Sequence, residues 1–379
     1  MKIILAPDKF KSNMTSPQIC AIMERAFHDV FPDWQIISLP LADGGDGTTR
    51  ALAAATGAEL RTVCVMGPLG GEVEAEYAYN PVERTGVVEM ASASGIALVD
   101  RKDLNPLKAT TFGTGQVIRQ LLNDGAESIT IGIGGSATVD GGTGMAQALG
   151  FKFLDKNGNE LGSGAAPLAE LDRIDCSAVD PRLKHVKIAV ACDVTSPLLG
   201  PEGAAFVFGP QKGATPEMVE ILEKNLSILA QVWLKQGFLA SVTEPGDGAA
   251  GGLGAGLRAF CNATSRSGAR LVMAASHFEE HLQGADLVIT GEGQTDTQTE
   301  SGKLCSEVAA VSHAAGVPVM LLSGALAGAD LTAFNKVFDY AFSISSGHIT
   351  LEDAIKNGPR DLAFFTYNLA KIIQGFSKK

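Results

Sequence analysis

The stretch ITIGIGGSATVDGGTG, residues 129–144, is the part of the chain on which the choice of fold depends. A short β-branched segment runs directly into residues that are mostly glycine or small, with Asp140 among them. A glycine-rich exit from a strand can hold a phosphate, hold a dinucleotide or simply form a turn. These alternatives differ in what must follow the loop.

A dinucleotide site is the first alternative, and it would make the protein an NAD(P)-dependent dehydrogenase. The pattern Gly132-x-Gly134-x-x-Ala137 fits the dinucleotide fingerprint, and Asp155 ends a strand at about the expected distance. However, the loop continues through residues 138–142 before a helix can begin, whereas the fingerprint opens directly into one. Asp140 would also repel a pyrophosphate in the absence of a metal. The dinucleotide alternative is therefore weak.

The rest of the chain repeats one pattern, a short buried strand followed by a small or acidic turn and then by an amphipathic helix. Strands are expected at residues 3–8, 35–43, 128–135, 286–293, 317–325 and 340–347, and helices at 115–124, 302–315 and 351–374. This alternation favours an α/β fold with a doubly wound, mainly parallel, Rossmann-like sheet. Residues 59–81 alternate around a Gly-Pro/Gly-Gly turn and predict an antiparallel hairpin.

The length of 379 residues favours two domains. We expect residues 1–58, 105–150 and 249–379 to form a discontinuous Rossmann-like domain. Residues 59–104 and 151–248 break the strand–helix pattern and are expected to form a second, smaller, inserted α/β domain. The active site is expected in the cleft between the two.

Composition excludes several classes of protein. The net charge is −12 and no basic run precedes the terminal Lys378-Lys379, so nucleic acid is not an expected partner. The six cysteines are scattered without metal-ligand spacing, as is typical of reduced thiols. No stretch approaches the roughly 18 apolar residues of a membrane helix, and the apolar run in MKIILAPDKFK is too short for the one expected in a signal peptide. We therefore expect a cytoplasmic protein with no membrane partner.

Carboxylates follow nearly every expected strand, where ligands of open α/β sheets bind. The residues at these strand ends are Asp8 and Lys11, Asp43 and Asp46, Ser136 and Asp140, Asp193, and Glu292 and Asp296. Carboxylates hold Mg²⁺ or accept a proton from a hydroxyl, while lysines and glycine-rich loops neutralise and cradle phosphates. The combination favours phosphoryl transfer, although any single aspartate here could be a helix cap. No Walker loop or protein-kinase signature is present.

Several strings together resemble the class I glycerate kinases, in the same order and over nearly the whole chain. They are APDKFK (6–11), PLADGGDGT (40–48), GIGGSATVDGGTGMAQALG (132–150), ACDVTSPLLG (191–200), FGPQKGA (208–214), GAAGGLGAGL (248–257) and TGEGQTD (290–296). The resemblance implies a Rossmann-like domain with a second α/β domain. It also implies transfer of the γ-phosphate of ATP to a hydroxyl of D-glycerate, commonly the 2-hydroxyl. The chain departs from the family's usual motifs at Val139 and Ser196, where asparagine is frequent, and fine substrate preference could change with them.

The resemblance and the strand ends together suggest roles for individual residues. The expected catalytic residues are Asp43, Asp193 and Lys11, with either aspartate as the base. The expected ATP-binding residues are Gly134, Gly135, Ser136, Thr138, Gly141, Gly142, Glu292 and Lys303, and the expected Mg²⁺ ligands are Asp140, Asp296 and Asp8. A cap on the helix that begins near Gly142 is the alternative role for Asp140.

Three points remain open at this stage. A non-catalytic nucleotide-binding protein would share the same loops. The two hydroxyls of glycerate are not distinguished, so the product is 2- or 3-phosphoglycerate. A homo-oligomer is compatible with the sequence but not indicated by it.

Overall fold

The computed structural model describes the chain except for residues 11–12, 43–44, 46, 296–303, 327–331, 333, 346, 348–349 and 378–379, and the side chains of 376 and 377. Its contacts divide the chain into two compact units. The terminal unit comprises Met1–Asp43, Ala54–Thr56 and Ala269–Lys379. The inserted unit comprises Gly44–Ala53 and Gly57–Gly268. Each is described by itself below.

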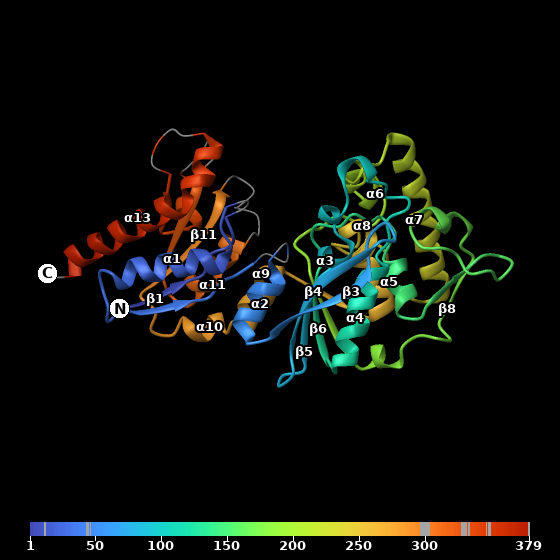
Figure 1. The fold of residues 1–379 in the computed structure, drawn as a ribbon, viewed down its shortest axis with the longest axis horizontal. Helices are drawn as coiled ribbons and strands as arrows, with labels where there is room; N and C mark the ends of the chain where they lie inside the picture. The colour runs from blue at the N-terminus through green and yellow to red at the C-terminus, as the bar shows by residue number, and fades with distance from the viewer. Residues whose placement is uncertain are drawn as a thin grey trace. The chain divides into compact units, whose positions relative to one another are not determined.

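The terminal unit contains a parallel sheet of five described strands in the order β13-β12-β11-β1-β2 (Figure 1). The strands are β1 (Lys2–Leu5), β2 (Gln35–Ser38), β11 (Leu287–Thr295), β12 (Val319–Leu326) and β13 (Tyr340–Ser343). Numbered along this unit alone, the order is 2-1-3-4-5, one of the two common doubly wound arrangements. The order reverses between β1 and β11, so the carboxyl ends of these two strands mark the expected ligand crevice.

Helices cover both faces of this sheet. They are α1 (Ser16–His28), α9 (Gly268–Ala275), α10 (Phe278–His281), α11 (Leu304–Ala314), α12 (Phe334–Val337) and α13 (Leu351–Ser377). Helices α1 and α13 pack together, and their apolar faces join Ile3, Leu5 and Ile289 in one buried cluster. Since successive strand residues point to opposite faces, the fully buried Val288 faces the other side, where α11 packs on β11 and β12.

The inserted unit has a mixed sheet of six described strands in the order β10-β9-β6-β5-β4-β3. These strands are β3 (Glu59–Met66), β4 (Glu72–Asn80), β5 (Thr85–Glu89), β6 (Ser128–Gly132), β9 (Lys187–Ala191) and β10 (Thr264–Arg266). β3 and β4 form the antiparallel hairpin that the sequence predicts, and β5, β6, β9 and β10 run parallel. A small antiparallel pair, β7 (Lys152–Leu154) and β8 (Arg173–Asp175), lies outside this sheet.

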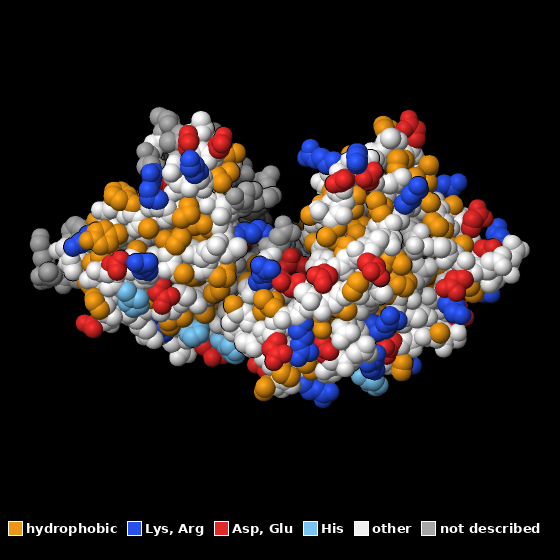
Figure 2. Space-filling view, viewed as in Figure 1, with side chains coloured by type: hydrophobic (Ala, Val, Ile, Leu, Met, Phe, Trp, Pro, Cys, Tyr) orange, Lys and Arg blue, Asp and Glu red, His pale blue; other side chains and the backbone are white. Residues whose placement is uncertain are grey.

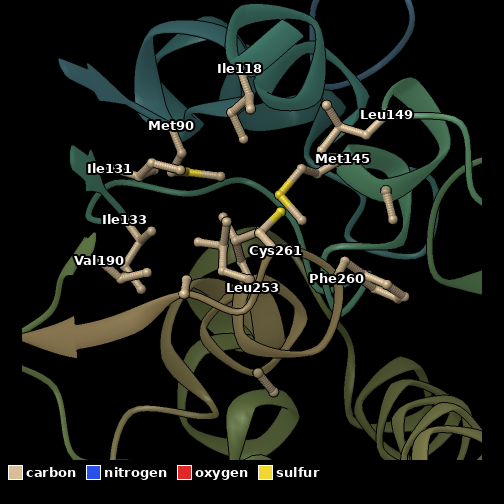
Figure 3. Close-up of a cluster of buried hydrophobic side chains, with 14 of the residues drawn as sticks. Met90, Ile118, Ile131, Ile133, Met145, Leu149, Val190, Leu253, Phe260 and Cys261 are labelled. Carbon is tan, nitrogen blue, oxygen red and sulfur yellow. The ribbon is translucent and has the colours of Figure 1, made fainter. Parts of the chain in front are cut away.

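Except for the first, the helices of the inserted unit contribute side chains to one large apolar core. They are α2 (Thr48–Thr56), α3 (Ala91–Ser94), α4 (Phe112–Asp124), α5 (Thr143–Ala148), α6 (Ala204–Phe208), α7 (Pro216–Gln236) and α8 (Ala249–Cys261). Short 3₁₀ helices span Ile96–Leu98, Arg101–Asp103, Ala166–Glu170, Pro181–Lys184 and Pro210–Lys212. Figure 3 shows Met145 of α5 beside Cys261 of α8, in the same cluster as Ile131 of the sheet and Ile118 of α4. The α5–α8 contact is therefore part of the core.

The division into units differs from the one expected. Residues 59–104 and 151–248 fall in the inserted unit, but so do residues 44–53, 57–58, 105–150 and 249–268. The physical reason is strand pairing, because β6 pairs with β5 on one side and β9 on the other, which places the glycine-rich loop in the inserted unit. The inserted unit is also the longer of the two, not the smaller one. The mostly parallel, two-part α/β architecture is confirmed.

Close backbone packing explains the glycines at the start of α8. A Cβ at residue 256 would lie 2.3 Å from the carbonyl oxygen of Gly141, and a Cβ at residue 251 would lie 2.0 Å from that of Thr138. The amide of Gly141 donates to the Gly251 carbonyl at 3.0 Å. The loop after β6 and the first turns of α8 thus touch backbone to backbone, which only glycine allows.

This packing predicts that replacing a glycine of α8 with alanine destabilises the protein, which is the opposite of the usual effect of this substitution in a helix. Alanine is normally favoured over glycine inside a helix by up to about 1 kcal/mol. Gly256→Ala should instead destabilise the protein by about 1–3 kcal/mol, because the methyl group has no space. Gly375→Ala in α13, where a Cβ would meet no atom within 4 Å, is the matched control and should be neutral or stabilising. Urea unfolding measures both, and equal effects of the two substitutions would contradict the packing argument.

Candidate active site

Two acidic residues lie at the crevice of the terminal unit. Asp8 follows β1 and Glu292 lies near the end of β11, and these strands pair directly. The amide of Asp8 donates to the Gly291 carbonyl at 2.8 Å, which joins the two strand ends. Glu292 is half-buried, and its Oε1 lies 3.0 Å from the hydroxyl of Thr295. The structure thus brings these two predicted residues to the same edge of the sheet.

The glycine-rich loop of the inserted unit occupies residues 133–142, between the end of β6 and the start of α5. A helix does not follow the GxGxxA pattern directly, so the geometry of a dinucleotide fingerprint is not met. Gly134 and Gly135 are exposed, while Ser136 is 7% exposed. The loop is fixed on one side by α3 and the turn after it, since Ile96 N donates to Gly135 O at 2.8 Å.

Asp140 is fully buried at the start of two helices. Its Oδ2 accepts hydrogen bonds from the Thr111 amide at 2.8 Å, the Thr111 hydroxyl at 2.9 Å and the Gly144 amide at 3.2 Å. Its Oδ1 accepts from the Gly142 amide at 3.1 Å. Thr111 is the N-cap of α4, and Gly142 is that of α5. These are the contacts of a helix cap, the alternative role considered for this residue.

The electrostatics of Asp140 reflect this burial. Loss of water raises the pKa of the carboxyl group, and the hydrogen bonds from Thr111, Gly142 and Gly144 oppose that rise. The positive ends of α4 and α5 also favour a negative charge at this position. The hydrogen bonds of this carboxyl group tie the loop to the starts of both helices.

Lys212 is a site residue that the sequence analysis missed. It ends the 3₁₀ helix Pro210–Lys212 and is 2% exposed. Its Nζ donates to the Ser136 hydroxyl at 2.6 Å and to the Thr138 carbonyl at 2.8 Å. Burial lowers the pKa of Lys212 to about 7, against the opposing influence of the Asp140 charge. In the sequence this lysine is indistinguishable from a solvated one, because FGPQKGA gives no sign of its burial.

The other loop residues predicted to bind ATP, Thr138, Gly141 and Gly142, pack against the interior of the inserted unit. Thr138 is fully buried, and its hydroxyl has no hydrogen-bond partner among the described residues. Gly141 and Gly142 are buried, with φ of 62° and 77°, conformations that favour glycine. A Cβ at residue 141 would lie 2.5 Å from Leu229 Cδ2 of α7. These three residues face the interior, unlike Gly134 and Gly135.

Asp193 follows β9 and is exposed. Its Oδ1 accepts a hydrogen bond from the Gly268 amide at 3.1 Å. A second acidic residue of this region, Asp247, was not predicted. It is 1% exposed and forms an ion pair with Arg258 of α8, which fixes the segment that leads into this helix.

Four predicted residues lie outside the described part of the chain, namely Lys11, Asp43, Asp296 and Lys303. Among the residues that are described, no group of three or more His, Cys, Asp or Glu side chains is placed to hold a metal ion. In the same part of the chain, no helix has the length and apolar character to cross a bilayer. Figure 2 shows basic and acidic side chains intermingled on the face in view, with no continuous basic stripe among those described.

Comparison with known proteins places these features in a family. The model of the glycerate kinase family matches residues 3–374. The chain belongs to the glycerate kinase family. It is therefore an enzyme, an ATP-dependent kinase that phosphorylates a hydroxyl group of glycerate.

Individual relatives span essentially the whole chain. A glycerate kinase of Halalkalibacterium halodurans is 44% identical over 370 residues, which cover 98% of this chain and 97% of the relative. A glycerate 2-kinase of Escherichia coli is 44% identical over 371 residues, with the same coverage of both chains. A crystal structure from Salmonella typhimurium, assigned as glycerate kinase 2, superposes with a TM-score of 0.91 at 43% identity and covers 100% of both chains.

The buried Lys212 predicts a specific pH dependence of stability. Below about pH 7 the folded and unfolded chains both carry the charge, and the folded state bears its full desolvation cost. Between about 7 and the ordinary lysine value of 10.5, the unfolded chain binds more protons, so this residue makes stability rise with pH. Lys212→Met should remove that rise, as urea unfolding across this window would reveal. Lys102→Met, at an exposed position, should leave the slope unchanged; an unaltered slope in Lys212→Met would contradict the assignment.

Proposed function

We propose that this protein transfers the γ-phosphate of ATP to the 2-hydroxyl of D-glycerate in an Mg²⁺-dependent reaction, giving 2-phosphoglycerate. The observation that carries the proposal is the family match over residues 3–374. The name of the Escherichia coli relative, glycerate 2-kinase, supports the position of phosphorylation. The free cysteines support a cytoplasmic location.

In the inserted unit we assign phosphate binding to the exposed backbone of Gly134 and Gly135 and to the hydroxyl of Ser136. Because the Ser136 oxygen accepts from Lys212, its own proton points elsewhere and is available to a phosphate oxygen. The buried residues of the loop then affect ATP binding indirectly, because they set the conformation of the loop. These residues are Thr138, Asp140, Gly141 and Gly142. For Asp140 we favour this capping role over direct contact with Mg²⁺, since four donors of the chain already surround its carboxylate.

In the terminal unit we assign Mg²⁺ to Asp8 and Glu292, with Asp296 as a further ligand. Carboxylate oxygens at adjoining strand ends suit Mg²⁺, which is usually held by one or two carboxylates, water and phosphate oxygens. The bound ion would neutralise charge on the phosphates. Lys303 would add a positive charge toward the same groups.

For the acceptor we assign Asp193 or Asp43 as the base and Lys11 as a contact to phosphate or to the glycerate carboxylate. The base takes the proton of the glycerate hydroxyl as its oxygen bonds to the γ-phosphorus. The bond from that phosphorus to the bridging oxygen breaks, and ADP leaves. The hydrogen bond from the Gly268 amide fixes the orientation of the Asp193 carboxylate.

The activity is tested by incubating the protein with ATP, Mg²⁺ and D-glycerate and following ADP release. We expect ADP release that depends on glycerate and on Mg²⁺, with 2-phosphoglycerate as the product seen by ³¹P NMR. ATP with Mg²⁺ should raise the melting temperature, while NAD and NADP should not. Stabilisation by ATP without glycerate-dependent ADP release would indicate a non-catalytic nucleotide-binding protein. Release of 3-phosphoglycerate would overturn the assigned position.

The candidate bases are tested separately. Asp193→Asn and Asp43→Asn each remove a proton acceptor while keeping the size of the side chain. Whichever is the base should lose about 100-fold or more in kcat, with a smaller change in KM for ATP. Asp103→Asn, at an exposed position in a 3₁₀ helix, is the matched control and should retain full activity. Near-normal turnover in both variants would remove both aspartates from this role.

A further inference from the structure

A cavity of about 260 Å³ lies within the terminal unit at the carboxyl edge of its sheet. Its floor comes from the ends of three strands or the turns after them, with Gln294 of β11, Ala325 of β12 and Ser345 after β13. Phe10, from the segment after β1, and the first three turns of α13 also line it. The cavity therefore lies where ligands of this strand order bind.

The chemistry of the lining selects the kind of ligand. Most of the surface is apolar, from Phe10, Ala325, Ile344, Leu351, Ala354 and Ile355. The polar groups are the amides of Asn13 and Gln294, the hydroxyl of Ser345 and the carboxyl of Asp361. None of the described residues that line the cavity is basic, so it does not suit a phosphate or the carboxylate of glycerate. It suits a flat, uncharged ring with hydrogen-bonding groups on its edge.

Two features show that the polar wall is held in place. The hydroxyls of Ser343 and Ser345 both donate to the carbonyl of Gly324, which fixes the end of β12 against β13. On the helix side, a Cβ at residue 358 would lie 2.0 Å from Asn13 Nδ2. Gly358 thus lets α13 approach the Asn13 amide at the edge of the cavity.

The cavity adjoins the proposed magnesium ligands. Phe10 lies two residues after Asp8, and Gln294 lies two residues after Glu292, so the chain runs from the acidic pair into the cavity wall at both places. A nucleotide has this same division between an uncharged base and charged phosphates that carry the metal. Apolar and acidic surfaces next to each other fit the two ends of one such ligand.

We propose that this cavity binds the adenine base of the ATP used by the kinase. The proposal rests on the proposed function, and it adds a nucleotide-base site formed by Phe10, Asn13, Gln294, Ser345 and the start of α13. The ring packs against apolar lining residues such as Phe10 and Ile355, and its edge nitrogens bond to the amide and hydroxyl groups.

Filling the cavity tests this assignment. Ala354 is half-buried in the wall, and Ala354→Phe would occupy the space of the ring. We expect KM for ATP to rise at least tenfold while KM for glycerate stays within about twofold. Ala363→Phe is the matched control, because Ala363 lies in the same helix, is also half-buried and does not line the cavity. It should keep both KM values.

Binding measurements distinguish the site for the base from the site for the phosphates. Adenosine, which lacks phosphates, should bind the unaltered protein in calorimetry and should not bind Ala354→Phe, whereas Mg²⁺-tripolyphosphate should bind both. If Ala354→Phe fails to fold, Leu351→Ala serves instead, because Leu351 is 75% exposed at the cavity and its removal should weaken adenosine several-fold. Adenosine binding and KM for ATP that are unchanged in the folded cavity variants would overturn the base site alone. Absence of glycerate-dependent ADP release by the unaltered protein would instead overturn the proposed function, whatever adenosine does.

Discussion

The buried carboxylate of Asp140 is the interaction on which the glycine-rich loop depends. A charge removed from water is costly unless its hydrogen bonds are replaced, and here the chain supplies four donors from the starts of α4 and α5. On the same loop, Lys212 holds Ser136 and Thr138 from the other side. The conformation of the exposed part of the loop is therefore fixed by contacts within the chain itself. Such preorganisation is what electrostatic stabilisation of a transferred phosphoryl group requires.

The glycines of this loop fall into two groups with different physical tasks. Gly141 and Gly142 are buried, have positive φ and lie against α7 and α8, so they permit close packing. Gly134 and Gly135 are exposed and leave the backbone accessible. The sequence alone does not distinguish the two groups, because both consist of glycine. Only the positions of α7 and α8, which come much later in the chain, distinguish the two groups.

The sequence predicts what depends on local pattern and misses what depends on distant pairing. The hairpin β3–β4 and the helices α4 and α13 follow from periodicity, and the placement of Asp8 and Glu292 at one edge follows from the parallel sheet. The division into units could not be read in this way, because it depends on β6 pairing with β5 and β9. Lys212 was missed for a related reason: the burial of a lysine depends on elements that pack around it, and its neighbours in the chain do not reveal them.

Val139 shows how burial changes the meaning of a departure from a family motif. The sequence alone suggested that this residue, where related chains often carry asparagine, could alter contact with a ligand. Val139 is fully buried in the apolar core of the inserted unit, between the loop's Thr138 and Asp140. Its side chain packs inward, and the backbone on either side is fixed by Lys212 and by the helix starts. A valine suits such an apolar position better than an amide, which would need a hydrogen-bond partner there. The departure therefore acts on the packing beneath the loop, while the phosphate-facing residues proposed here, Gly134 to Ser136, are untouched by it.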